Sequence, residues 1–99
     1  MVRQGAIYEH TVGTSRYRVA VVSSDAHNDT GKTPWIVPIR HGTVDAPPYL
    51  VALTDPDPLS GVLDVDRMIR ALPNGDEIGI LTGATMTRLR EAIYAVFAA

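Results

Sequence analysis

The stretch from Tyr17 to Arg40, YRVAVVSSDAHNDTGKTPWIVPIR, decides the fold of this chain. It holds two apolar, β-rich runs, Tyr17–Val22 and Trp35–Ile39, on either side of a polar segment with several turn-forming residues. β-Branched and aromatic residues favour strands, while Gly, Pro, Asn and Asp favour the turns between them. The pattern therefore predicts two strands joined by a long, polar and mobile loop.

Arginines stand at the outer ends of both predicted strands. If the strands pair antiparallel, Arg18 at the start of the first and Arg40 at the end of the second lie at the same edge of the sheet, away from the loop. We expect the two guanidinium groups to come together there and to line a groove. This edge is the candidate functional region.

Composition limits the classes of protein that the chain can belong to. With 99 residues, 45% hydrophobic and 20% charged, it suits one globular domain over residues 1–99. The absence of cysteine excludes disulfides and thiolate sites, and the three histidines show no metal-ligand spacing. No apolar run approaches the ~20 residues that cross a bilayer, and no signal peptide is visible. We expect a cytoplasmic protein without membrane contact, cofactor or metal.

The charges are unevenly distributed along the chain. The formal net charge is −2, yet residues 1–44 carry five basic and three acidic groups and are therefore locally basic. Residues 45–77 carry seven acidic groups and only two arginines. A basic site on an acidic body can bind a few phosphates, and an acidic partner can compete for it.

Turn residues divide the rest of the chain into short strands. Strands are predicted at Gly5–Thr11, Tyr49–Leu53 and Ile78–Leu81. The segments Gly61–Val65 (GVLDV) and Arg67–Leu72 (RMIRAL) are compatible with strands or one short helix; we favour strands because turn signals bracket the region.

Only the C-terminal segment has a clear helical period. Between Thr85 and Ala98 the apolar residues form one stripe, which indicates a helix packed on the sheet with Thr82 as its N-cap. The stripe residues are Met86, Leu89, Ile93, Val96 and Phe97, and Arg88 and Arg90 are expected to be solvated. The fold predicted is mainly β, a small and strongly bent antiparallel sheet or barrel with a C-terminal helix across it.

The standard catalytic motifs are missing, but arginines, one histidine and hydroxyl groups gather around the predicted strand ends. RNA cleavage by the neighbouring 2′-hydroxyl suits such a set, because it needs a base, an acid and a cation but no metal. Arg18 and Arg40 could act on phosphate oxygens, and His41 could exchange protons. Of Arg16 and Arg18, at least one is a candidate phosphate ligand, while a surface charge or carboxylate partner is the simpler reading for the other. Thr43 is a weaker candidate, since threonine is common in turns.

Acidic and aromatic residues leave further alternatives open. Asp64 and Asp66 alternate along a predicted strand, where they pair with Arg67 or Arg70 or shape a base pocket; pairing is the simpler reading. Trp35 and Tyr49 could stack on bases, although a core role is more usual for aromatics in a chain with six of them.

Several segments resemble the MazF/PemK toxins in the right order along the chain. RQGAIYEH resembles the opening strand of that family, and RVAVVSSDAHN resembles its second strand and following polar loop. WIVPIRHGT resembles its third strand, which typically ends in Pro-Ile-Thr-Ser. DPLSGVLDVDRMIRAL is similar to the segment that leads into a Val-Asp-Gln signature, and LTGATMTRLREAI resembles the closing helix.

The resemblance implies an SH3-like barrel that forms a homodimer, and a sequence-selective endoribonuclease toxin that cuts single-stranded RNA at short sequences. It also implies an antitoxin whose acidic C-terminal arm occupies the RNA groove. Arg18 matches the family's catalytic arginine, while the Thr-Ser of the family pattern falls on Arg40 and His41, with Thr43 the nearest hydroxyl. These departures imply that His41 or Thr43 has taken over part of the proton transfer, or that activity is weak or altered.

The resemblance also assigns residues that position RNA. Asp66 occupies the place of the aspartate in the Val-Asp-Gln segment, with Arg67 in place of glutamine. Arg16 and Arg40 join them as RNA-binding candidates. Two alternatives stay open: a gyrase poison like CcdB, which shares the barrel but has no RNase site, and a non-catalytic barrel that binds a peptide or nucleic acid.

Overall fold

The strand pair predicted from the sequence forms the middle of the sheet. In the computed structural model, which describes residues 2–98, β2 (Ser15–Val21) and β3 (Trp35–Arg40) are antiparallel, with Arg18 opposite Ile39. The residues from Val19 to Val21 are fully buried, as expected for a strand covered on both faces.

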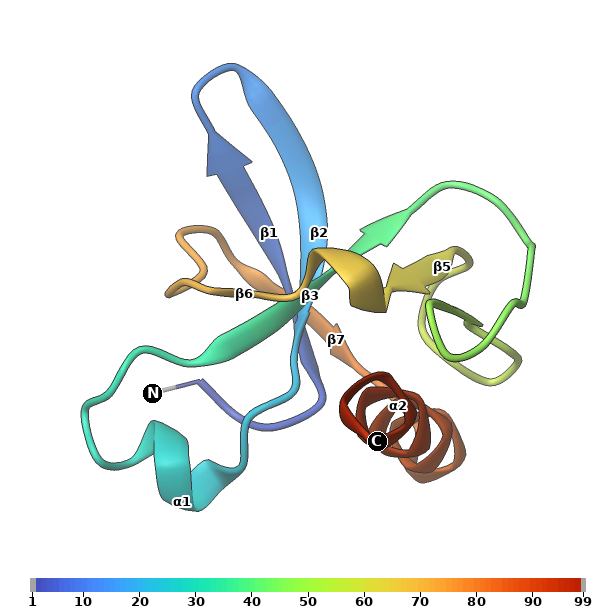
Figure 1. Ribbon diagram of the computed structural model, residues 1–99. Coiled ribbons are helices and arrows are strands. Elements are labelled where there is room, and N and C mark those ends of the chain that lie inside the picture. Colours follow the sequence, from blue (N-terminus) through green and yellow to red (C-terminus); the bar gives the residue numbers. More distant parts are fainter. Residues whose placement is uncertain (1, 99) are drawn as a thin grey trace.

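Short antiparallel strands extend the sheet on both sides of this pair. The order is β4-β5-β3-β2-β1-β7, and β6 branches off to pair with the start of β3. The sheet is curled and open, and the β1–β2 hairpin projects beyond the rest of the molecule (Figure 1). The additional strands are β1 (Ala6–Val12), β4 (Leu50–Ala52), β5 (Val62–Asp64), β6 (Ile69–Arg70) and β7 (Glu77–Ile80). The predicted mainly β fold with a C-terminal helix is confirmed.

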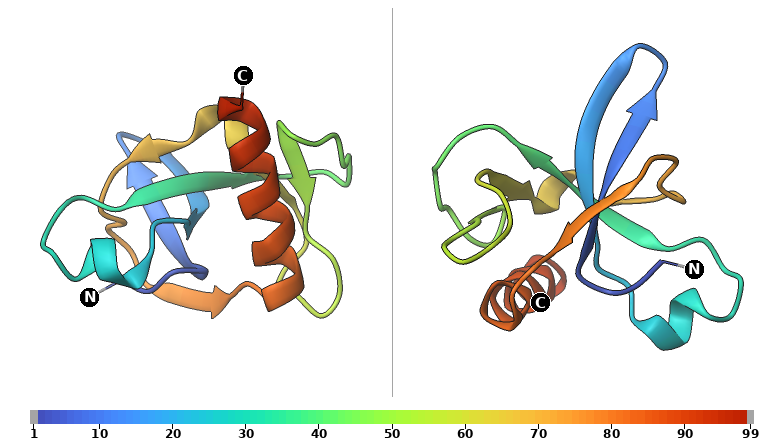
Figure 2. Two further views of the ribbon diagram at one scale, coloured as in Figure 1. Left: turned by 60° about the horizontal axis from the view of Figure 1, so that its bottom comes forward. Right: turned by 180° about the vertical axis from the view of Figure 1, so that it is seen from behind.

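The C-terminal helix α2 (Gly83–Phe97) lies across one face of the sheet (Figure 2). Leu89 is fully buried and Met86 nearly so, and both contact the larger core cluster under the helix. Thr82 is the N-cap, as predicted, because its hydroxyl accepts a hydrogen bond from the backbone N–H of Thr85 at 3.2 Å.

Asp57 ties the preceding turn to the start of α2. Its carboxylate accepts hydrogen bonds from the backbone N–H groups of Thr54 and Thr82, each at 2.9 Å, and from the hydroxyl of the fully buried Thr85. Partial burial opposes ionisation of this carboxyl, but the hydrogen bonds from Thr82, Thr85 and Thr54 outweigh burial and hold its pKa below the usual value.

Two predicted segments contain helical turns. The polar segment after β2 is not wholly irregular, because it contains helix α1 (Asp25–Asn28), and the buried Asn28 hydrogen-bonds Ser23. A 3₁₀ turn, η1 (Val65–Arg67), separates β5 from β6 and includes Val65 and Arg67, which we predicted as the end of one strand and the start of the next. Local hydrogen bonds of Ser and Asn side chains explain the first difference.

Several predicted side-chain environments are wrong. Trp35 and Tyr49 are 37% and 53% exposed, so neither is a core residue, and Arg70 lies 5.6 Å over the Trp35 ring. Phe97 is 73% exposed because the end of α2 extends past the core. Arg88 is not simply solvated: its Nη2 donates to the carbonyl of residue 52 at 2.8 Å and thereby joins α2 to β4.

Across residues 2–98 the structure contains no helix that is long and apolar enough to span a membrane.

Candidate functional site

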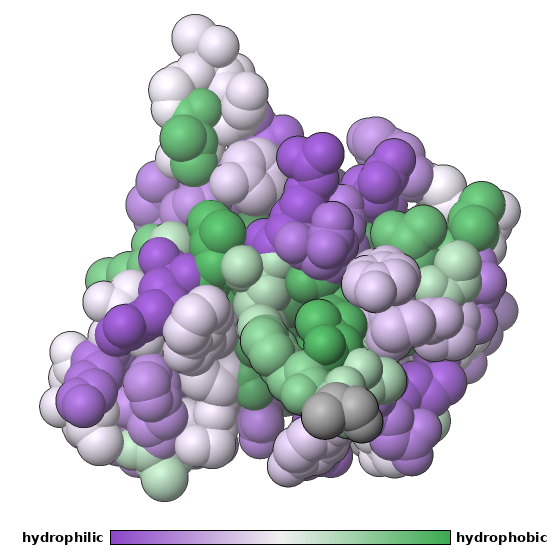
Figure 3. All heavy atoms as spheres, viewed as in Figure 1, coloured by the Kyte–Doolittle hydropathy of each residue, from purple (hydrophilic) through white to green (hydrophobic). Residues whose placement is uncertain are grey.

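A groove of about 1150 Å³ opens at the end of β3, where the sequence placed the candidate edge. Residues from β1, β2, the end of β3, the turn before β5, the end of β5, η1 and the start of β6 line it. Figure 3 shows hydrophilic side chains gathered over η1 and the neighbouring part of the sheet, next to an apolar area beside α2. The polar and charged lining residues are Glu9, Ser15, Arg16, Tyr17, Arg18, Arg40, His41, Ser60, Asp64, Asp66 and Arg67.

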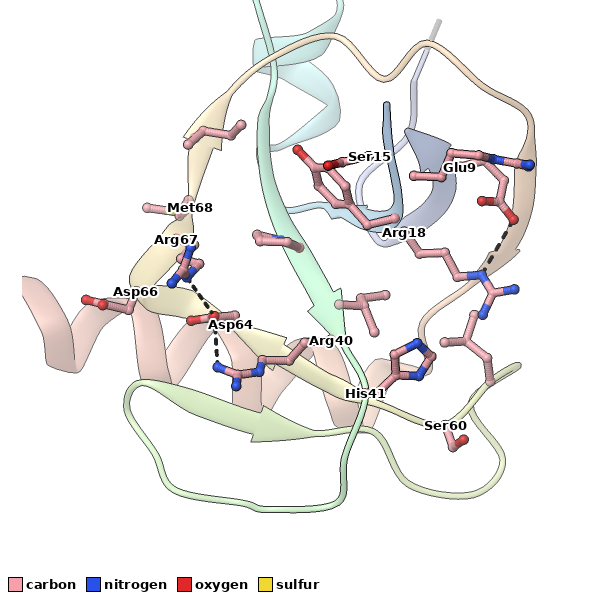
Figure 4. Close-up of a pocket in the computed structure, with 16 residues that line it drawn as sticks. Glu9, Ser15, Arg18, Arg40, His41, Ser60, Asp64, Asp66, Arg67 and Met68 are labelled. Atoms are coloured by element: carbon pink, nitrogen blue, oxygen red, sulfur yellow. Dashed lines mark hydrogen bonds and ion pairs between the residues drawn. The ribbon is translucent and has the colours of Figure 1, made fainter. Parts of the chain in front are cut away.

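The strand register places the two predicted arginines on opposite faces of the hairpin. Directly opposed residues of an antiparallel pair point to the same side, so Arg18 shares the face of Ile39, and Arg40, one residue further, points to the other. Figure 4 accordingly shows Arg18 and Arg40 on opposite sides of β3. Both arginines line the groove as expected, but the expectation that their guanidinium groups meet is wrong.

On one side, Arg18 is held by Glu9 on the neighbouring strand. The two residues are directly opposite each other, and Arg18 Nε lies 3.5 Å from Glu9 Oε1. The backbone of Glu9 is fixed in turn, because its N–H donates to the carbonyl of Asp76 at 2.9 Å and because Gly75 packs against it. Arg18 remains half-exposed and keeps further N–H groups for an anion in the groove.

On the other side, Asp64 holds two arginines. Arg40 Nη1 lies 3.4 Å and Arg67 Nε 3.3 Å from the same oxygen, Asp64 Oδ2 (Figure 4). Asp64 is only 5% exposed, and a buried carboxylate needs such partners. The predicted pairing of Asp64 with Arg67 is confirmed. The predicted alternation of Asp64 with Asp66 is wrong, because Asp66 belongs to η1, where strand periodicity has ended.

The remaining candidates divide between the groove and its outside. Arg16 and His41 are exposed and line the groove, and His41 lies on the same side of β3 as Arg18 (Figure 4). Thr43 does not line it, since the chain leaves the sheet at Gly42, whose φ is +129°. Ser60 supplies a hydroxyl that sequence reasoning missed.

The sequence did not indicate Glu9 as a groove residue, and for Asp64 it indicated the ion pair but not the position in the groove. For Glu9 a signal existed, because a two-residue turn at residues 13–14 fixes the register that places it opposite Arg18. Nothing in the local pattern places Ser60 in the same groove as His41; only the folded sheet does.

The groove is more basic than the protein as a whole. Four arginines line it against three carboxylates, whereas the chain has a net charge of −2. No group of three or more potential metal ligands occurs in the described part of the chain, residues 2–98. The arrangement can bind anions, stabilise developing negative charge and exchange protons through an exposed imidazole.

Solved structures with the same architecture are known, although no protein-family model and no curated protein sequence matches the chain. One is an endoribonuclease in complex with its cognate antitoxin from mycobacterial species, with a TM-score of 0.85 and 26% identity over 98% of this chain and 95% of that one. A second mycobacterial endoribonuclease gives a TM-score of 0.84 at 24% identity, covering 97% of this chain and 90% of that chain. A MazE–MazF structure from Deinococcus radiodurans gives 0.75 at 18% identity over 98% and 95%.

This is a MazF-like fold. The resemblance drawn from the order of sequence segments is thereby confirmed, and the match covers almost all of both chains. Within the MazF-like fold, the groove lies between the first half of β2, which carries Arg18, and the end of β3, at Arg40.

Proposed function

We propose that this single-domain protein is a MazF-like toxin, an endoribonuclease that cuts single-stranded RNA without a metal ion. The observation that carries this proposal is the basic groove, in which an anchored arginine and an exposed histidine lie on the same side of β3. The similarity to a mycobacterial protein named an endoribonuclease, at 26% identity over almost the full length, supports the same activity.

In the proposed reaction the RNA supplies its own nucleophile. The 2′-hydroxyl oxygen forms a bond to the adjacent phosphorus, the bond from phosphorus to the 5′-oxygen breaks, and the products are a 2′,3′-cyclic phosphate and a 5′-hydroxyl. Arg18 would stabilise the extra negative charge on the pentavalent phosphorane. His41 would exchange a proton with the attacking or leaving oxygen. Thr43 lies outside the groove and receives no role.

The other groove residues would position the RNA strand. Arg16, Arg40 and Arg67 offer guanidinium groups to backbone phosphates, and Asp66 offers an acceptor to a base edge. Glu9 would keep Arg18 in place through the cross-strand ion pair.

We infer that the protein acts in the cytoplasm as a homodimer and is opposed by an antitoxin. The first mycobacterial structure contains an endoribonuclease together with its cognate antitoxin. An antitoxin segment rich in Asp and Glu would suit the groove, because four arginines line it.

Incubation of purified protein with mixed RNA in EDTA tests the activity. Discrete cuts with 2′,3′-cyclic phosphate ends are expected. Arg18→Ala should slow cutting by about 10²–10³-fold, the usual cost of losing one donor to a developing oxyanion. The matched control is Arg90→Ala, since Arg90 is an exposed arginine on α2 that does not line the groove.

Undiminished cutting by Arg18→Ala would refute the catalytic assignment. Absence of cuts, together with stalled gyrase complexes, would instead favour a gyrase poison on the same barrel.

A further inference from the structure

We propose that Arg40, Asp64 and Arg67 form a second phosphate-binding subsite, which holds the RNA backbone on the side of β3 opposite Arg18. The inference rests on the proposed function and adds to it a positioning residue, Asp64, and a bound group, one phosphodiester remote from the cut. Three observations carry it: the burial of the carboxylate, its sharing by two arginines, and the exposure of those arginines toward the groove.

The burial of Asp64 means that the cluster is fixed by the fold. Its side chain is 7% accessible and belongs to β5, which pairs with both β3 and β4. An ionised carboxylate in such a place is stable only when cations compensate it. Arg40 comes from the last position of β3 and Arg67 from η1, so two separate elements converge on one oxygen.

The arginines are left with a net positive charge and unused donors. Their side chains are 60% and 77% exposed, and each contacts Asp64 through one nitrogen, Nη1 of Arg40 and Nε of Arg67. Two guanidinium groups against one carboxylate leave one positive charge. A guanidinium has five N–H donors, so both residues retain donors that can reach into the groove.

A phosphodiester fits this arrangement better than a carboxylate does. Two guanidinium groups that approach from different elements can each donate to a different non-bridging oxygen of one tetrahedral phosphate, whereas a planar carboxylate is matched by a single guanidinium fork. The groove is continuous from this cluster to Arg18, so one RNA strand can reach both places.

The test measures binding of random-sequence 2′-O-methyl RNA, which cannot be cut through its 2′-position, by fluorescence anisotropy at several salt concentrations. Arg40→Ala and Arg67→Ala should each weaken binding at least about tenfold, as expected for charge-assisted hydrogen bonds. The slope of log K against log salt should fall by about 0.7 for one lost phosphate contact to a single strand. Because both arginines are proposed to bind the same phosphate, the salt slope of the double variant should fall no further than that of either single variant. The salt slope of Arg90→Ala should be unchanged.

Asp64→Asn separates positioning from simple charge. It makes the groove more positive, so electrostatics alone predicts tighter binding; loss of the shared anchor predicts weaker binding, which is the expected result. Asp29→Asn changes the net charge equally at an exposed position away from the groove and serves as the control. Thermal unfolding of each variant identifies any that fails to fold, and Arg67→Ala, at an exposed position, keeps the test decisive.

Cutting kinetics then distinguish the two proposals. A subsite predicts that Arg67→Ala raises KM while kcat is kept, in contrast to Arg18→Ala. RNA cutting with unchanged KM and salt slope in Arg67→Ala overturns the subsite alone. Arginine-dependent RNA binding without any cutting by the wild type overturns the endoribonuclease and leaves the subsite standing. If Arg40→Ala and Arg67→Ala weaken binding of an acidic peptide but not of RNA, the cluster belongs to a protein partner and the proposal is overturned.

Discussion

Asp57→Ala should destabilise the protein by about 2–3 kcal/mol, because this one side chain accepts hydrogen bonds from two groups at the start of α2, in Thr82 and Thr85, and from one in the preceding turn, Thr54. Hydrogen bonds to an ionised acceptor contribute about 1.5–3 kcal/mol each, and losing a helix-capping interaction costs about 0.5–2 kcal/mol. The carboxylate is half-buried, so in the variant water can take over some of the hydrogen bonds that Asp57 accepts, which lowers the expected loss. Water reaches the hydroxyl of Thr85 least easily, because Thr85 is fully buried, so this group is the hardest to satisfy once the carboxylate is gone.

Urea unfolding followed by far-ultraviolet circular dichroism and by the fluorescence of the single tryptophan measures this loss. For a domain of this size the corresponding fall in Tm is roughly 10–20 °C. Asp29→Ala is the matched control, because Asp29 is exposed. A loss below about 0.5 kcal/mol, the level of ordinary surface substitutions, would refute the view that Asp57 anchors α2.

The stability that Asp57 contributes should also decrease at low pH. The pKa of Asp57 is lowered in the folded protein, so protons bind the unfolded state more readily. Its contribution is fully present above the unfolded value near pH 4 and is lost as pH falls through the folded value. The stability gap between wild type and Asp57→Ala should therefore shrink below about pH 4. A difference in unfolding free energy that stays constant as the pH falls through this range would contradict the view that the ionised Asp57 carboxylate makes the stabilising hydrogen bonds.

Two other substitutions test the scaffold, one at the glycine packed against Glu9 and one at the contact between α2 and β4. Gly75→Ala would place a Cβ 2.5 Å from the Glu9 carbonyl oxygen, so unfolding should become easier by about 1–3 kcal/mol, and Gly83→Ala, with open space around it, should be neutral in the same urea titration. Arg88→Met keeps the aliphatic stem but loses the 2.8 Å bond to the carbonyl of Ala52; a cost of about 1 kcal/mol is expected, and no change would mean that this bond does not hold α2 to β4.

The sequence determined the topology near the centre better than the environment of single side chains. Alternating and continuous apolar runs predicted strands at β1, β2 and β3, and the antiparallel arrangement considered for the two central runs is the one that β2 and β3 form. Trp35 and Tyr49 were misplaced because hydrophobicity indicates burial only on average; Trp35 is the first residue of β3, Tyr49 directly precedes β4, and both are exposed.

The candidate site was predicted in position but not in geometry. Counting strand ends placed Arg18 and Arg40 at one edge, and both line the groove. The face that each side chain occupies depends on the exact strand register. Arg18 pairs with Ile39 and not with Arg40, and this shift of one residue puts the two arginines on opposite faces. Ser60 joins the groove only through tertiary folding, and the 3₁₀ turn that begins directly after Asp64 and contains Asp66 has no clear local signal.

The opposed faces of β3 restrict the shape of any RNA that uses the whole groove. A strand that contacts Arg18 and also Arg67 has to curve around the end of β3 near His41. A flexible single strand can make such a bend within a few nucleotides, whereas a double helix bends appreciably only over tens of base pairs. Stems of folded transcripts would thus escape this protein while their loops and tails were cut, so that RNA folding itself would select the targets.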